Sequence, residues 1–141
     1  FNGYFRNDSA NANAFRGGWY HTGDLLRREG GHYFFVDRKS DLIRYKGRSV
    51  SSLALESVAL KHSAVIQAAA FGVTSAELEA EHEIMLAVVT ERSADLDEEA
   101  LATFINENAP YYFVPRYIEI VDQLPLTPTQ KIQNLQHDTF L

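Results

Sequence analysis

Two long apolar runs in the second half of the chain constrain its fold more than any other feature. The first covers residues 65–73 and ends at a glycine-containing turn, and the second covers residues 84–89. Apolar runs of this length, bounded by turn residues, are typical of strands that are buried on at least one face. Residues 116–121 alternate between apolar and polar side chains, as an edge strand does. The sequence therefore predicts a small sheet.

Two helices are expected beside these strands. Ser51 or Ser52 should cap the first helix, because a serine hydroxyl can accept a hydrogen bond from an unpaired N–H group of the first turn. Its apolar face comprises Leu53, Leu55, Val58, Ala59 and His62. Asp95 and Glu98 resemble a capping box at the start of the second helix, which must end at Pro110. The apolar stripe of that helix consists of Leu101, Phe104 and Ile105.

A polar, charged break is expected to divide the chain into two parts. The first part, residues 1–38, is rich in turn formers and aromatic residues, and its short apolar pieces at residues 19–20 and 32–36 suit β-strands. Residues 10–15 suit a short helix. The second part, residues 39–141, contains the strands and helices described above. The sequence thus predicts a β-rich leader followed by an α+β unit.

The composition narrows the classes of function. With 13 Lys and Arg against 19 Asp and Glu, the formal net charge is −6, which argues against nucleic acid as a partner because binding its phosphates requires a surplus of cations. The chain has no cysteine, and its five histidines lack the spacing of metal ligands. No apolar run approaches the ~20 residues that cross a bilayer. We therefore expect no metal site, no membrane span and a cytoplasmic location.

One candidate site combines Asp24 and Arg38. Asp24 ends the stretch Gly18-Trp19-Tyr20-His21-Thr22-Gly23-Asp24, and a carboxylate held after this glycine turn can accept hydrogen bonds from both hydroxyls of a ribose. Arg38 follows a predicted strand, and its planar guanidinium can hold a sugar hydroxyl or a phosphate oxygen. Each residue also has an ordinary explanation, which is a surface turn for Asp24 and an ion pair with Asp37 or Asp41 for Arg38.

A second candidate site is a basic hairpin turn that comprises Arg44, Lys46, Gly47 and Arg48. Glycine suits such a turn because it adopts a positive φ without a clash of a Cβ atom. Several cations around a tight turn are typical of a surface over which a phosphorylated ligand passes. A solvated hairpin turn without a ligand would explain the same residues.

A third candidate is Lys131, which follows a stiff, proline-containing arm at residues 124–130. An ammonium group on such an arm can be brought to the charge that develops between a carboxylate and an α-phosphate. Most lysines near a C-terminus have no such role, so this residue gains weight only from its context.

The three candidate groups occur in the order and spacing found in adenylate-forming (AMP-binding) enzymes. The chain resembles the C-terminal portion of their acyl-CoA synthetases, or ligases, over nearly its whole length. The local sequences of residues 35–38 and 50–52 are similar to those of the crotonobetaine/carnitine–CoA ligase branch. The motifs that carry the resemblance are residues 1–5, 14–15, 18–24, 36–47 and 124–132.

This resemblance implies a fold and a reaction. The fold is a small mixed sheet flanked by helices, as in the mobile C-terminal lobe of these enzymes, which residues 39–141 would form. Residues 1–38 would be the β-rich end of the large N-terminal AMP-binding domain. In the reaction, ATP and a carboxylic acid give an acyl-adenylate and pyrophosphate, and the thiol of CoA then displaces AMP. Asp24 and Arg38 would bind the nucleotide and Lys131 would act in adenylation. Lys39 and Ser40 would form the hinge about which the lobe turns, bringing the basic turn to CoA.

The resemblance also implies cofactors and partners. ATP, magnesium and CoA would serve the full-length enzyme, and none should be bound tightly by this fragment, because the resemblance places the ATP phosphate-binding loop upstream of it. The expected partners are the protein's own N-terminal domain, a small carboxylic acid, ATP and CoA. Two alternatives stay open: an adenylation domain that loads a carrier protein, and a non-catalytic α+β interaction module.

Overall fold

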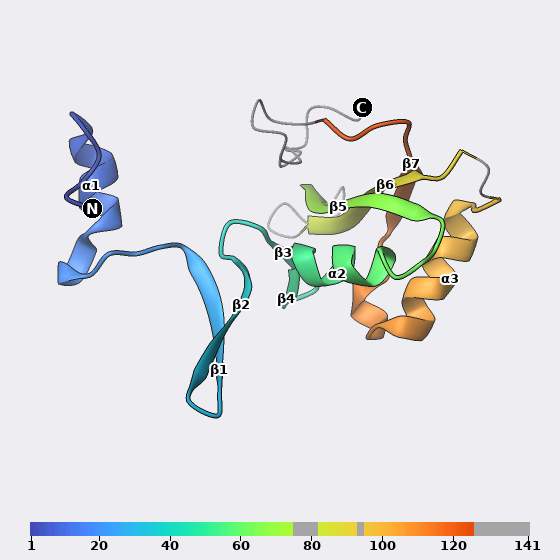
Figure 1. Cartoon of the computed structure of the whole chain (residues 1–141), viewed down its shortest axis with the longest axis horizontal. Coiled ribbons are helices and arrows are strands. Elements are labelled where there is room, and N and C mark those ends of the chain that lie inside the picture. The colour runs from blue at the N-terminus through green and yellow to red at the C-terminus, as the bar shows by residue number, and fades with distance from the viewer. Residues whose placement is uncertain (75–81, 93–94, 126–141) are drawn as a thin grey trace. The chain divides into compact units, whose positions relative to one another are not determined.

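The computed structural model describes residues 1–74, 82–92 and 95–125 (Figure 1). The chain forms two compact units, Phe1–Ser40 and Asp41–Leu141. The domain boundary expected between residues 38 and 39 stays a prediction, because a compact unit of this chain need not coincide with a domain of the whole protein.

A three-stranded sheet forms the centre of the second unit. Its strands are β5 (Val65–Thr74), β6 (His82–Thr90) and β7 (Tyr117–Ile120), in the order β5-β6-β7. β5 is antiparallel to β6, and β7 is parallel to β6, so the sheet is mixed. The strands predicted from the two apolar runs and from the alternating segment are confirmed.

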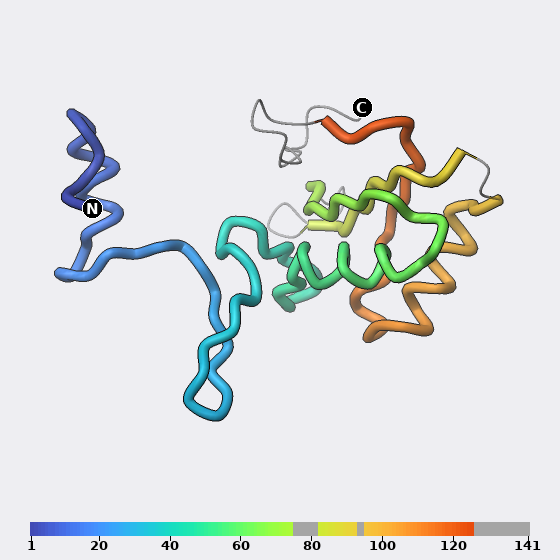
Figure 2. The backbone as a smooth tube through the Cα atoms, in the orientation of Figure 1, coloured from blue at the N-terminus to red at the C-terminus, as the bar shows by residue number. Residues whose placement is uncertain are grey.

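Both faces of this sheet are buried. Successive side chains of a strand point to opposite faces, so the apolar runs supply two separate clusters. The larger cluster includes alternate residues of β5 and β6, namely Ala68, Ala70, Ile84, Leu86 and Val88. The smaller cluster contains Ala69, Phe71 and Ala87, packed against Leu124. Leu124 belongs to the segment that runs back over the sheet after β7 (Figure 2). Burial on both faces explains why β5 and β6 lack an alternating pattern.

Two helices, α2 (Ser52–Ala59) and α3 (Glu98–Asn108), pack on the larger cluster (Figure 1). Leu101 and Ile105 of α3 are fully buried and Phe104 packs beside them, so the predicted stripe is confirmed. On α2, Leu55 is fully buried, but Leu53 is 42% exposed. Including Leu53 in the apolar face was wrong, because residues two apart in a helix project to different sides.

The helix caps partly match the predictions. Ser51 caps α2 as expected, since its Oγ accepts a hydrogen bond of 3.1 Å from the N–H of Ala54. The cap of α3 is Asp97, whose Oδ1 accepts a hydrogen bond of 2.7 Å from the N–H of Ala100. The expected capping role of Asp95 was wrong, because α3 begins only at Glu98 and the cap must directly precede the helix.

The hairpin of β3 (Leu42–Tyr45) and β4 (Arg48–Ser51) leads directly into α2 (Figure 2). Its two-residue turn consists of Lys46 and Gly47, which both have positive φ, at 48° and 71°. Two consecutive positive φ values define the type I′ turn that suits the twist of a tight hairpin. Ile43 and Val50 face each other across the hairpin and are buried in the larger cluster. The predicted hairpin is confirmed.

The first unit has little buried apolar surface. It contains α1 (Asp8–Ala14), a 3-10 turn η1 (Arg16–Gly18), and a hairpin of β1 (Asp24–Glu29) and β2 (His32–Arg38) closed by two glycines. The strand predicted at residues 19–20 was wrong. The backbone there bonds to the preceding helical segment instead of a partner strand: the Trp19 N–H donates to the Arg16 carbonyl (3.5 Å), and the N–H of the next residue but one, His21, donates to the Ala14 carbonyl (2.7 Å).

These elements confirm the predicted α+β fold. Within the described part of the chain, no helix is long and apolar enough to cross a membrane.

Candidate functional site

The hairpin β1–β2 brings Asp24 and Arg38 together. The two residues lie directly opposite each other at the open end of the hairpin, and Arg38 Nε lies 3.4 Å from Asp24 Oδ1. The side chains are 28% (Asp24) and 62% (Arg38) exposed, so a ligand can reach both. Their joint role in binding stays a prediction, but the contact between them is a fact of this fold.

Backbone hydrogen bonds fix the open end of this hairpin. The N–H of Lys39 donates to the Gly23 carbonyl at 2.8 Å, and the N–H of Asp24 donates to Thr22 Oγ1 at 3.1 Å. Lys39 is therefore still tied to the hairpin, whereas Ser40 is the last residue of the first unit. The hinge role expected for these two residues stays a prediction.

Sequence reasoning did not single out Tyr20, whose pKa is affected by the charges of Asp24 and Arg38. A hydrogen bond with Tyr4 raises the pKa of the Tyr20 phenol above its ordinary value, the Asp24 carboxylate raises it further, and the Arg38 guanidinium lowers it. The sequence signal that could have indicated Tyr20 is its position in the stretch Gly18–Asp24, which ends at the candidate site.

Aromatic rings hold two cations of the basic turn. The Nζ atom of Lys46 lies 4.9 Å from the centre of the Tyr45 ring, and the Cζ atom of Arg48 lies 4.9 Å from the centre of the Tyr112 ring. A hydrogen bond with Tyr45 also raises the pKa of the Lys46 ammonium above its ordinary value. Lys46 is therefore charged throughout the neutral pH range.

No carboxylate of residues 1–74, 82–92 and 95–125 forms an ion pair with Arg44, Lys46 or Arg48 of the basic turn. The ion pairs Arg27–Glu29 and Arg38–Asp24 lie in the hairpin β1–β2. Glu83 on β6 acts on Lys46 only as a charge at longer range, and Glu83 Oε2 is buried without a hydrogen-bond partner. The positive charge of the turn is therefore available to an anionic ligand.

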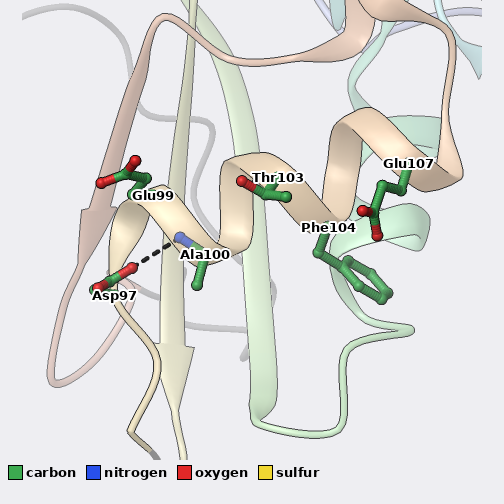
Figure 3. Close-up of a pocket in the computed structure, with 6 residues that line it drawn as sticks. All are labelled: Asp97, Glu99, Ala100, Thr103, Phe104 and Glu107. Carbon is green, nitrogen blue, oxygen red and sulfur yellow. Dashed lines mark hydrogen bonds between the residues drawn. The ribbon is translucent and has the colours of Figure 1, made fainter.

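A hollow of about 410 Å³ lies along α3 (Figure 3). Three carboxylates make it acidic, and one of them already serves as the cap of α3. None of the site residues expected from the sequence lines it. Its lining consists of Asp97, Glu99, Ala100, Thr103, Phe104 and Glu107.

Lys131, the expected catalytic residue, lies outside the described residues. Within the ranges that the structure does describe, no group of three His, Asp or Glu side chains is arranged to hold a metal ion.

Comparison with known protein families matches residues 54–131, more than half of the chain, to the AMP-binding enzyme C-terminal domain. The 2-succinylbenzoate–CoA ligase of Geobacillus kaustophilus is 40% identical over 132 residues, which cover 92% of this chain and 26% of that protein. The chain spans about a quarter of the length of the curated relatives it matches.

Two solved structures share the architecture. The amide bond synthetase McbA from Marinactinospora thermotolerans aligns with a TM-score of 0.81 and 32% identity, over 94% of this chain and 26% of that one. The o-succinylbenzoate CoA synthetase of Bacillus subtilis, solved with its acyl-adenylate intermediate, aligns with a TM-score of 0.81 and 28% identity, over 92% of this chain and 26% of that one. The predicted arrangement of a small mixed sheet with flanking helices is thus one that these enzymes share.

Proposed function

Since the chain belongs to the family of AMP-binding enzyme C-terminal domains, we propose that it is the C-terminal part of an ATP-dependent acid–CoA ligase. The Geobacillus relative is itself a CoA ligase, and this chain aligns with only a quarter of it. The activity therefore belongs to a full-length protein in which this chain works together with an N-terminal domain.

In this proposal, the full-length protein joins a carboxylic acid to CoA in two steps. ATP, bound with magnesium, first activates the acid as an acyl-adenylate and pyrophosphate leaves. The sulfur of CoA then attacks the acyl carbon and AMP leaves with the electrons of the broken bond. Lys131 supplies a positive charge next to the carboxylate and α-phosphate in the first step, which lowers the barrier by stabilising the charge that develops there.

The contact between Asp24 and Arg38 is the observation that carries this proposal. A ribose presents two neighbouring hydroxyl groups, and a carboxylate fixed by its backbone can accept a hydrogen bond from each. The guanidinium on the opposite strand orients that carboxylate, and its remaining N–H groups can donate to the nucleotide. In this proposal, the two residues that face each other at the open end of the hairpin form one nucleotide-binding edge.

The exposed apolar surface of the first unit supports an N-terminal domain as partner. Every residue of β1 is exposed, and Leu26 and Phe35 on the two strands are each 52% exposed. Trp19 is 78% exposed. A two-stranded hairpin is marginal on its own, and exposed apolar patches mark interaction sites. We propose that this hairpin is the end of the N-terminal domain and that the rest of that domain, in the full-length protein, covers it.

The second half-reaction uses the basic turn. After adenylation, the lobe rotates as a rigid body about Lys39 and Ser40, and the turn around Gly47 comes to face CoA. Arg44, Lys46 and Arg48 then lie near the phosphates of CoA, whose charge they oppose. The same lobe therefore serves both steps with different surfaces.

Replacing Asp24 with Ala in the full-length protein should raise KM for ATP about 10- to 100-fold, because hydrogen bonds to a charged group contribute about 1.5–3 kcal/mol. The measurement is ATP-dependent pyrophosphate exchange at a saturating concentration of the acid. Glu29→Ala is the matched control, since this carboxylate lies at the other end of β1. Equal KM values for both variants would contradict the role of Asp24.

Pyrophosphate release tests the function as a whole. The full-length protein should release pyrophosphate with ATP and a suitable acid from a panel, and should form a thioester when CoA is added. The 141-residue chain alone should release none, because we place the phosphate-binding loop and the acyl pocket outside it. Turnover by this chain alone would refute that assignment.

The acid and the acyl acceptor are narrower proposals. The local sequences of residues 35–38 and 50–52 support the inclusion of crotonobetaine and carnitine in the panel of acids. An adenylation domain would pass the acyl group to a carrier protein instead of free CoA, and an interaction module would release no pyrophosphate. We also propose a cytoplasmic location, which agrees with the use of ATP and CoA.

A further inference from the structure

We propose that Tyr112 is a positioning residue that holds Arg48 of the basic turn toward a phosphate group of CoA. This inference rests on the proposed function and names a residue that no sequence motif indicates. Its basis is the placement of the Arg48 guanidinium over the face of the Tyr112 ring.

Arg48 lies where the basic turn meets a distant element. It is the first residue of β4, directly after the turn, and it pairs with Tyr45 across the hairpin. Tyr112 comes from η2 (Tyr111–Phe113), a 3-10 turn between α3 and β7. The contact of 4.9 Å between the Arg48 Cζ atom and the ring centre therefore links two elements that are far apart in the sequence.

The Tyr112 ring is itself held firmly. Its ring packs partly buried against the larger core cluster. The rings of Tyr111 and Phe113 meet it edge-on, with centres 5.5 Å and 5.4 Å away. The N–H of Phe113 donates to the Pro110 carbonyl at 2.8 Å, which closes the 3-10 turn. A fixed ring restricts the orientations that the long arginine side chain can adopt.

The type of contact decides what Arg48 can do. A ring attracts a cation through its quadrupole and leaves the net charge in place, whereas a carboxylate would neutralise it. A guanidinium that rests with its carbon over a ring keeps N–H groups at its edge for oxygen acceptors. Arg38 is an example of an arginine in this chain that contacts a carboxylate, because it forms an ion pair with Asp24. Arg48 is thus oriented without being neutralised, which suits a phosphate as its ligand.

The experiment compares variants of the full-length protein for the two half-reactions. Tyr112→Leu should raise KM for CoA about two- to fivefold, the change that corresponds to losing a cation–ring contact at an exposed site. The rate of pyrophosphate exchange should not change. Tyr112→Phe keeps the ring and should leave KM for CoA at its original value, so it is the matched control.

Pantetheine, which has the thiol of CoA but no phosphate, separates this role from a merely structural one. Tyr112→Leu should leave KM for pantetheine unchanged. In an Arg48→Ala background, Tyr112→Leu should add no further increase in KM for CoA, because the residue that it positions is gone.

Three results would overturn the inference. The first is an unchanged KM for CoA in Tyr112→Leu. The second is a rise in KM for pantetheine in Tyr112→Leu as large as the rise for CoA. The third is a loss of pyrophosphate exchange that is as large in Tyr112→Phe as in Tyr112→Leu. Failure of the proposed function looks different, because the unmodified full-length protein would then form no thioester with CoA for any acid.

Discussion

Replacing Lys131 with Ala in the full-length protein should slow adenylation about 100- to 1000-fold, while transfer of the acyl group from a preformed acyl-adenylate to CoA should change much less. The lysine ammonium is proposed to stabilise charge that exists only in the transition state of the first step. Removing one such group typically costs about 2.7–4 kcal/mol. The affected quantity should be kcat, because the ground-state substrates gain little from this contact.

The measurement separates the two steps. Pyrophosphate exchange reports adenylation, and single-turnover thioester formation from added acyl-adenylate reports transfer. Lys61→Ala is a suitable control, since Lys61 is an exposed lysine just beyond α2. If both half-reactions of Lys131→Ala slowed equally, the lysine would have a general role in stability. If neither slowed, the chain would act as an interaction module.

The sequence predicted the second unit better than the first because its signals are local and strong. Runs that are apolar at nearly every position leave few alternatives to buried strands, and a glycine after Lys46 favours a type I′ hairpin. Trp19 and Tyr20 gave a false strand signal, because aromatic residues are frequent in strands but also cluster where no partner strand exists. The cap of α3 failed because Asp95 and Asp97 are both good caps, and only the helix start distinguishes them.

The candidate sites also differ in how far local sequence signals predict their contacts. The hairpin itself follows from Gly30 and Gly31, a two-residue turn signal that the sequence contains. The contact between Asp24 and Arg38 also depends on the irregular pairing between Leu25 and Leu26, because a regular register would place Asp24 opposite Asp37. The contact between Arg48 and Tyr112 could not be predicted in this way, because it depends on how α3 and the turn after it pack against the rest of the unit. Long-range packing of this kind has no local sequence signal.

Leu55→Ala should destabilise the chain by about 2–5 kcal/mol, because it removes fully buried methyl groups and leaves a cavity between α2 and the sheet. Leu53→Ala makes the same chemical change two residues earlier on the same helix, where the side chain is 42% exposed, and should cost less than about 1 kcal/mol. Any effect of alanine on helix propensity is common to both variants, so the difference between them measures burial alone.

Urea unfolding of the 141-residue chain, followed by far-UV circular dichroism, checks this difference. The single tryptophan, Trp19, lies in the first unit, so its fluorescence would report on the wrong part of the chain. Circular dichroism also detects α1 and the hairpin β1–β2, but most of the helix and strand signal comes from α2, α3 and the strands of the second unit. Equal midpoints for the two variants would mean that α2 does not pack on the sheet through Leu55. In that case the hairpin that precedes α2 would lose the support that places its basic turn.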